Sequence, residues 1–194
     1  MLNPADFWPT EKPNVKPDPQ GWFAPCVGDR VKSLLKPDMK VVLELGAWKG
    51  QSTRFICDCV PQAQVITIDT WEGSVEHQGS PDLVTLHETF LVNCWDYKNQ
   101  LVPIRMMTRD GMKFLKDEGI VPEFIFIDAD HSYEGVCADI TDALTYWPNI
   151  VVCGDDWAYG GKENPPYPVK KAALDMALKF GKEVESHSNG WSYR

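Results

Sequence analysis

The amino-acid sequence predicts an α/β fold, in which a mostly parallel sheet is covered by helices on both faces. Short apolar runs alternate with helical patterns along most of the chain. The chain then ends in two strand-like segments joined by Ser188-Asn189, a pattern that predicts a closing antiparallel hairpin. A length of 194 residues with 43% apolar content suits one globular domain. We expect an N-terminal arm over residues 1–26 and a single domain over 27–194.

Each expected element has a local reason. The apolar runs that predict the parallel strands are 40–45, 64–69, 101–107, 123–128 and 149–154. The helical patterns that separate or follow them are 51–60, 80–95, 111–118, 133–147 and 168–180. Pro61 stops the first helix, because it cannot continue the backbone hydrogen bonds. Ser80, Asp110 and Ser132 are the expected N-caps of the next three helices.

The arm is rich in proline and in large aromatic side chains. Residues 1–26 contain six of the 15 prolines, so this segment is expected to be extended or irregular. Phe7, Trp8, Trp22 and Phe23 also lie in it. Solvated linkers rarely contain so many aromatic residues, so we expect the arm to pack on the domain or on a partner subunit, which favours a homodimer. A disordered tail is the alternative.

Charge and composition exclude several classes of protein. The formal net charge is -9 with a pI near 4.9, and an acidic surface repels the phosphates of nucleic acid. No apolar run reaches 18 residues, so no membrane span is expected. The first residues lack the basic and apolar parts of a signal peptide, and the six cysteines include no CxxC pair. These features predict a cytoplasmic protein with reduced, buried thiols and no membrane or nucleic-acid partner.

A glycine-containing turn follows the first predicted strand, in "VVLELGAWKGQS" over residues 41–52. Gly46 and Gly50 allow the backbone to approach a ligand closely, and the following helix offers free amides at its N-terminus. The second glycine comes four residues after the first, which is not the GxGxxG spacing of dinucleotide-binding proteins. A purely structural β-α turn is the alternative.

An acidic residue ends the second predicted strand, in "VITIDTWEGS" over residues 65–74. Asp69 lies about 20 positions after the glycine turn, where a carboxylate can accept hydrogen bonds from both hydroxyls of a ribose. Trp71 follows it and would cover an adenine or sulfonium group, or would lie in the core instead.

Two further strands end in clusters of acidic residues. Asp128 and His131 follow "EFIFI", and Asp155 and Asp156 follow "NIVVCG". Ligands of parallel α/β sheets bind at the carboxyl ends of the strands, so we expect these side chains to meet. Three carboxylates suit a hard cation such as Mg²⁺, and His131 would accept a proton near neutral pH. Solvated loop residues or helix caps are the alternative.

Together, these four motifs resemble the class I S-adenosylmethionine-dependent methyltransferases, and in particular the small O-methyltransferases of the macrocin and catechol types. The resemblance covers residues 40–193 and implies a Rossmann-like fold with seven strands. It implies that the cofactor is bound at Glu44, Gly46, Gly50, Ser52, Asp69, Trp71, Thr108, Arg109 and Asp110. It also implies a divalent cation, Mg²⁺, at Asp128, Asp155 and Asp156, with Asp128 and His131 as catalytic residues. Asp156 stands where the catechol-type enzymes have asparagine, and His131 where they have a lysine base.

The expected activity is therefore methyl transfer from S-adenosylmethionine to a hydroxyl of a small-molecule acceptor. One alternative keeps the cofactor but methylates nitrogen or carbon without a metal. A cofactor-binding module without turnover is another, although such a module need not keep Asp128, His131, Asp155 and Asp156. The acceptor itself is not encoded in a motif, and we expect the arm and the segments 71–80 and 157–168 to determine it.

Overall fold

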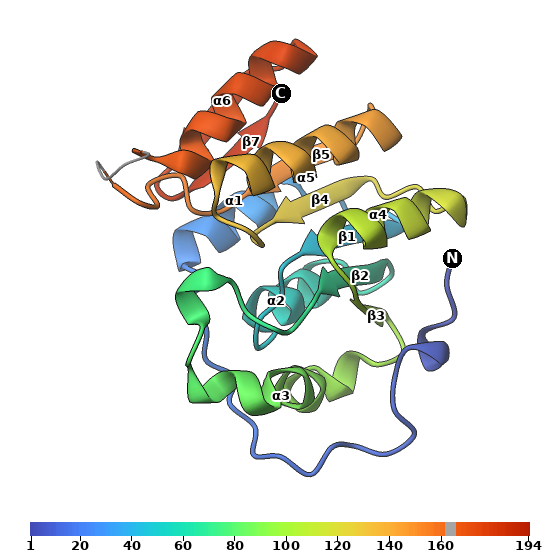
Figure 1. The fold of residues 1–194 in the computed structure, drawn as a ribbon. Coiled ribbons are helices and arrows are strands. Elements are labelled where there is room, and N and C mark those ends of the chain that lie inside the picture. Colours follow the sequence, from blue (N-terminus) through green and yellow to red (C-terminus); the bar gives the residue numbers. More distant parts are fainter. Residues whose placement is uncertain (162–165) are drawn as a thin grey trace.

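The computed structural model describes residues 1–161 and 166–194. In this part of the chain, seven strands form one sheet in the order β3-β2-β1-β4-β5-β7-β6 (Figure 1). The strands are β1 (Val41–Leu45), β2 (Gln64–Asp69), β3 (Leu101–Arg105), β4 (Phe124–Ile127), β5 (Val151–Gly154), β6 (Val184–His187) and β7 (Gly190–Tyr193). Strands β1 to β5 run parallel, whereas β7 is antiparallel to both β5 and β6. The predicted Rossmann-like sheet and its closing hairpin are confirmed.

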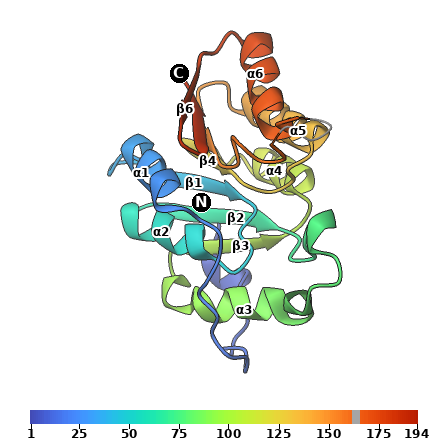
Figure 2. The ribbon, with the colours of Figure 1, turned by 90° about the vertical axis from the view of Figure 1, so that its left-hand side faces the viewer.

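Helices cover both faces of the sheet (Figures 1 and 2). The long ones are α1 (Pro25–Leu34), α2 (Gln51–Cys59), α3 (Leu86–Asn93), α4 (Thr108–Asp117), α5 (Tyr133–Tyr146) and α6 (Pro168–Phe180). The first three bury Val27, Ile56 and Phe90 in one apolar cluster. The last three bury residues such as Met112 and Ile140 in a second cluster on the opposite face. The core is thus a three-layer sandwich with two apolar interfaces.

The strand order places a ligand crevice at the centre of the sheet. The chain runs outward from β1 to β3 and then returns to the other side of β1 with β4. Leu45 pairs with Ile127, and Ile127 pairs with Gly154, so β1, β4 and β5 end level with one another. Open α/β sheets bind ligands where the strand order reverses in this way.

Two local predictions differ from the structure, and one helix was not predicted. The segment expected as one helix over 80–95 begins as the 3₁₀ helix η3 (Pro81–Thr85), with Ser80 accepting a bond from the amide of Asp82. Helix α4 begins at Thr108, so Asp110 lies inside its first turn and is not its N-cap. Helix α1 was not expected, and it begins at Pro25, inside the segment that was assigned to the arm. Ser132, in contrast, caps α5 as predicted.

The N-terminal arm lies along the domain near β3 and α3, as the blue trace in Figure 1 shows. Leu2 exchanges two hydrogen bonds with the side chain of Gln64, and the indole of Trp8 donates to the carbonyl of Leu101 at 2.8 Å. The arm therefore meets the sheet through specific contacts. Among the described residues, no disulfide is present, and none of the helices is long and apolar enough to cross a bilayer.

Candidate functional site

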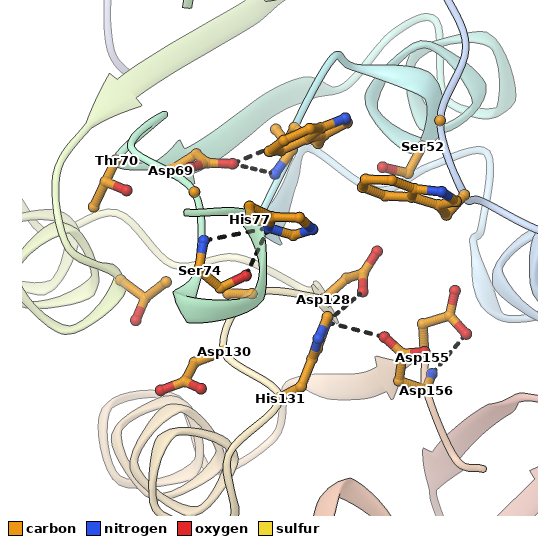
Figure 3. A pocket seen from close by; sticks show the side chains of 18 of the residues that line it. Ser52, Asp69, Thr70, Ser74, His77, Asp128, Asp130, His131, Asp155 and Asp156 are labelled. Atoms are coloured by element: carbon orange, nitrogen blue, oxygen red, sulfur yellow. Dashed lines mark hydrogen bonds and ion pairs between the residues drawn. The ribbon is translucent and has the colours of Figure 1, made fainter. Parts of the chain in front are cut away.

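A pocket of about 600 Å³ opens at the carboxyl edge of the sheet, above β1, β2, β4 and β5. The turns after these strands line it, together with parts of the arm and of segment 70–78. Figure 3 shows that the labelled side chains around this space come from the ends of different strands, as with Asp69, Asp128 and Asp155, and from neighbouring helices, as with Ser52 and His77. Eight predicted site residues line the pocket: Gly46, Ser52, Asp69, Thr108, Asp128, His131, Asp155 and Asp156.

The glycine turn after β1 presses against the tip of β4. Gly46 has a φ of +82°, and its amide donates to the carbonyl of Ile68 at 2.9 Å. A Cβ added to Gly46 would lie 2.0 Å from the carbonyl oxygen of Asp128. Only glycine permits this close approach. The cofactor-type turn and the first acidic tip are therefore direct neighbours.

Two predicted cofactor residues lie behind the pocket wall. Glu44 is fully buried and accepts hydrogen bonds of 2.6 Å from both Ser52 and Thr53. Burial raises the pKa of Glu44 to about 7. Gly50 faces α3, because a Cβ there would lie 2.4 Å from the sulfur of Cys94. Glu44 therefore orients the pocket residue Ser52, and Gly50 allows α3 to pack closely.

The carboxylate of Asp69 connects two turns. One oxygen accepts from the amides of Ala47 at 2.7 Å and Trp48 at 3.0 Å, and the other accepts from the amide of Trp71 at 2.7 Å. The side chain of Trp71 is only 2% exposed, packs on Phe90 and does not line the pocket. The structure thus places Trp71 in the core, which was the alternative to a cofactor-covering role.

Of the three residues predicted at the adenine edge, only Thr108 lines the pocket, and its hydroxyl donates to Asp139 at 2.6 Å. Arg109 is 66% exposed and pairs with Asp142 at 2.8 Å, while Asp110 is exposed on α4. Because α4 begins at Thr108, successive side chains point in different directions around its axis. Arg109 and Asp110 are therefore not part of the described pocket wall.

The acidic tips meet around His131. Its Nε2 lies 2.9 Å from Oδ2 of Asp156 and 3.7 Å from Oδ1 of Asp128. Possible ligand atoms of Asp128, His131 and Asp156 all lie within 4.8 Å of one another. Burial alone would lower the pKa of His131, but the two carboxylates outweigh it and raise that pKa to about 11. These contacts favour the protonated form of His131.

Asp155 lies beside this cluster and is held by its neighbours. Its Oδ1 accepts from the amide of Asp156 at 2.6 Å and from the side chain of Asn189 at 2.8 Å. Burial raises the pKa of Asp155 to about 7. Asn189 comes from the β6–β7 turn and lines the pocket, although its sequence context indicates only a hairpin turn. The ring side chains of Trp22, Trp48, His77 and Tyr159 also line it. Trp22, His77 and Tyr159 belong to the segments that were expected to determine the acceptor, whereas Trp48 was not predicted at the site.

Comparison with known proteins identifies the family. The model of the Methyltransferase domain family matches residues 43–157, which is more than half of the chain. No curated protein sequence matches significantly. Among solved structures, an O-methyltransferase from Bacillus cereus in complex with SAH is similar, with a TM-score of 0.63, 18% identity, and coverage of 88% of this chain and 80% of that chain.

Two methyltransferases of biosynthetic pathways share the fold at similar levels of identity. A TDP-rhamnose 3'-O-methyltransferase of calicheamicin biosynthesis has a TM-score of 0.59 and 15% identity, over 86% of this chain and 76% of that chain. A methyltransferase of the mycinamycin pathway, solved with Mg, SAH and mycinamycin VI, has a TM-score of 0.58 and 16% identity, over 89% of this chain and 49% of that chain. With the family match over β1 to β5, the chain belongs to the methyltransferase domain family and is a class I S-adenosylmethionine-dependent methyltransferase.

Proposed function

We propose that this enzyme transfers a methyl group from S-adenosylmethionine to a hydroxyl of a small molecule, with help from a divalent cation at Asp128, Asp155 and Asp156. The observation behind the proposal is the contact between Gly46 and the backbone of Asp128. It joins the turn that is typical of cofactor binding to the acidic tips, so donor and acceptor would bind side by side in one pocket.

On the donor side, four residues would contact S-adenosylmethionine. Gly46 and Ser52 would lie along its methionine part, Asp69 would accept from its ribose, and Thr108 would lie at its adenine. Glu44 would act indirectly, by fixing the hydroxyl of Ser52 through a 2.6 Å hydrogen bond. Asp69 would also keep the turn over 46–48 in place through the amides of Ala47 and Trp48.

On the acceptor side, the donor set fits a hard cation. Carboxylate oxygens of Asp128 and Asp156 lie close together, and the side chain of Asn189 donates to both Asp155 and Asp156. Such oxygen ligands are typical of Mg²⁺ sites. Burial raises the pKa of Asp128 and Asp155, so these carboxylates need positive charge nearby to stay ionised. The imidazolium of His131 supplies one such charge in the described structure. Its position between two carboxylates supports a cationic ligand there.

The chain's own residues would then position the reactants. The acceptor oxygen would attack the methyl carbon in line with the sulfur, forming a C–O bond as the C–S bond breaks. A bound divalent cation would lower the pKa of the acceptor hydroxyl. Positive charge bound at Asp128 and Asp156 would offset the attraction of these carboxylates for the proton of His131 and lower its pKa. His131 would then be neutral and able to accept the hydroxyl proton. Fixed geometry at the strand ends would supply much of the rate.

Calorimetric titration of chelator-treated protein tests this proposal. We expect S-adenosylhomocysteine to bind with micromolar affinity and Asp69→Ala to weaken it by at least about tenfold. We expect Mg²⁺ to bind to the wild type but not to Asp156→Ala. Asp117→Ala, which removes an exposed carboxylate of α4, is the matched control and should bind both ligands normally.

The outcomes separate the parts of the proposal. Cofactor binding without Mg²⁺ binding would contradict the cation-assisted mechanism and would favour transfer to nitrogen or carbon, or catalysis by His131 without metal. A wild-type protein that binds no S-adenosylhomocysteine, either with or without Mg²⁺, would contradict the whole proposal.

A further inference from the structure

Three aromatic rings from separate segments line the pocket and pack on one another. Trp22 lies in the arm, Trp48 in the turn after β1, and His77 in the 3₁₀ helix η2 (Val75–His77). The ring centroids of Trp22 and His77 are 5.3 Å apart with an interplanar angle of 8°, and those of Trp48 and His77 are 4.5 Å apart. In the view of Figure 3, His77 lies between Asp69 and Asp128. We call these three rings the aromatic roof.

A lysine at the base of this roof connects the segments that build it. The side chain of Lys49 is only 9% exposed. Its Nζ lies 2.6 Å from Oδ2 of Asp18, four residues before Trp22, and 2.9 Å from Oδ2 of Asp82, five residues after His77. Lys49 lies in the glycine turn itself, and its two ion pairs join this turn to the arm and to η3, the 3₁₀ helix that follows His77.

The side chain of Asn93 strengthens the same junction. Its Nδ2 donates to the carbonyls of Asp18 and Lys49, both at 2.8 Å, and its Oδ1 accepts from the amide of Asp18 at 3.1 Å. Asp18 is thus fixed through its side chain and through both of its backbone polar groups. Gln51 adds a further contact to the arm, because its Oε1 accepts from the amide of Phe23 at 3.2 Å.

We propose that Lys49 is a positioning residue, which holds the arm and the His77 segment together so that the aromatic roof encloses the bound cofactor. The inference rests on the proposed function, because it takes the pocket to be the cofactor site. The carboxylates that Lys49 joins are about half exposed, 47% for Asp18 and 45% for Asp82. Without the lysine they would become solvated, so the roof should loosen while the core keeps its packing.

Two measurements on Lys49→Met test this role. Chymotrypsin cleaves after aromatic residues, so cleavage after Trp22 or Phe23 reports opening of the roof. We expect cleavage about tenfold faster and affinity for S-adenosylhomocysteine about tenfold weaker than in the wild type. Lys49→Arg keeps the positive charge, so its cleavage rate and its affinity for S-adenosylhomocysteine should be close to those of the wild type. Lys113→Met, which breaks an exposed pair with Asp117 on α4, should match the wild type.

The outcomes distinguish this inference from the proposed function. The positioning role of Lys49 would be overturned if Lys49→Met showed the cleavage rate and the S-adenosylhomocysteine affinity of the wild type. Faster cleavage with unchanged affinity would overturn it as well. If the wild type itself bound no S-adenosylhomocysteine, the proposed function would fail, while the cleavage rates would still decide whether Lys49 fixes the arm. Should Lys49→Met not fold, Asp18→Asn provides the same test, with a smaller expected change because the Asp82 contact remains.

Discussion

At the scale of single residues, the site depends on backbone geometry as much as on charged groups. Asp156 has a φ of +62°, a conformation that Asp tolerates better than most residues, and this turn brings its carboxylate to His131. Gly46 reaches the tip of β4 because it has no side chain. Asp156 and Gly46 are therefore both placed by a local conformation that few other residue types adopt.

Gly46→Ala should destabilise the protein strongly. The new methyl group would overlap the carbonyl of Asp128 at 2.0 Å, in addition to the strain at φ +82°. We expect a loss of about 3–5 kcal/mol in the free energy of unfolding, measured by urea denaturation. Gly119→Ala is the control, since Gly119 has a φ of +68° but no described atom within 4 Å of an added Cβ. It should cost about 1 kcal/mol, and equal losses in the two variants would contradict the steric argument.

At the scale of elements, helices α4 and α5 meet at a buried carboxyl group. Asp139 on α5 is 2% exposed, and its Oδ1 accepts from Thr108 at the start of α4. Its Oδ2 has no hydrogen-bond partner among the described residues. Burial raises the pKa of Asp139 from 3.8 to about 7. The joint that places Thr108 in the pocket is therefore sensitive to pH.

The raised pKa predicts a pH-dependent difference between the wild type and Asp139→Asn. The folded state binds the proton more tightly than the unfolded state, so this contribution to stability is full below pH 3.8 and is lost as pH rises through about 7. Asn cannot ionise, so the variant should gain about 2 kcal/mol relative to the wild type between pH 5 and pH 8. Urea denaturation at several pH values measures this gain. A constant difference across that range would show that folding does not raise the pKa of Asp139.

At the scale of the whole molecule, the arm joins distant parts of the chain. It contacts the start of β2 through Leu2 and Gln64, the edge strand β3 through Trp8, and the pocket mouth through Trp22. The indole of Trp8 also packs edge-on against Trp95, with ring centroids 5.7 Å apart. The first part of the arm thus stabilises the sheet edge, whereas the last part shapes the site.

This division of roles predicts that one tryptophan of the arm affects mainly stability and the other mainly cofactor affinity. Trp8→Ala removes a hydrogen bond and partly buried apolar area, so it should lower the free energy of unfolding by about 2 kcal/mol with little effect on cofactor affinity. Trp22→Ala removes a ring that is 69% exposed and should cost less than about 0.5 kcal/mol, but should weaken S-adenosylhomocysteine binding. Thermal denaturation and calorimetry of both variants check this. Equal effects on stability would contradict the division.

The sequence by itself determined the layered fold and the strand ends that carry the chemistry. Alternating apolar runs and helical patterns are local signals, so they predicted the parallel sheet and the hairpin. Asp69, Asp128, Asp155 and Asp156 follow such runs directly. Parallel strands end at one edge of a sheet, so these residues had to lie near one another.

Only the tertiary structure decided which of these side chains face the pocket and in what charge state. Trp71 and Arg109 point elsewhere and Gly50 faces α3, because these directions depend on where a turn or helix begins. Two carboxylates from different strands surround His131 and raise its pKa. Asn189 comes from the β6–β7 turn, far in sequence from Asp155, to which it donates. The rings of the aromatic roof also come from distant segments, which the ion pairs of Lys49 join. Non-local packing and electrostatics leave no periodic trace in the chain, so they could not be predicted from it.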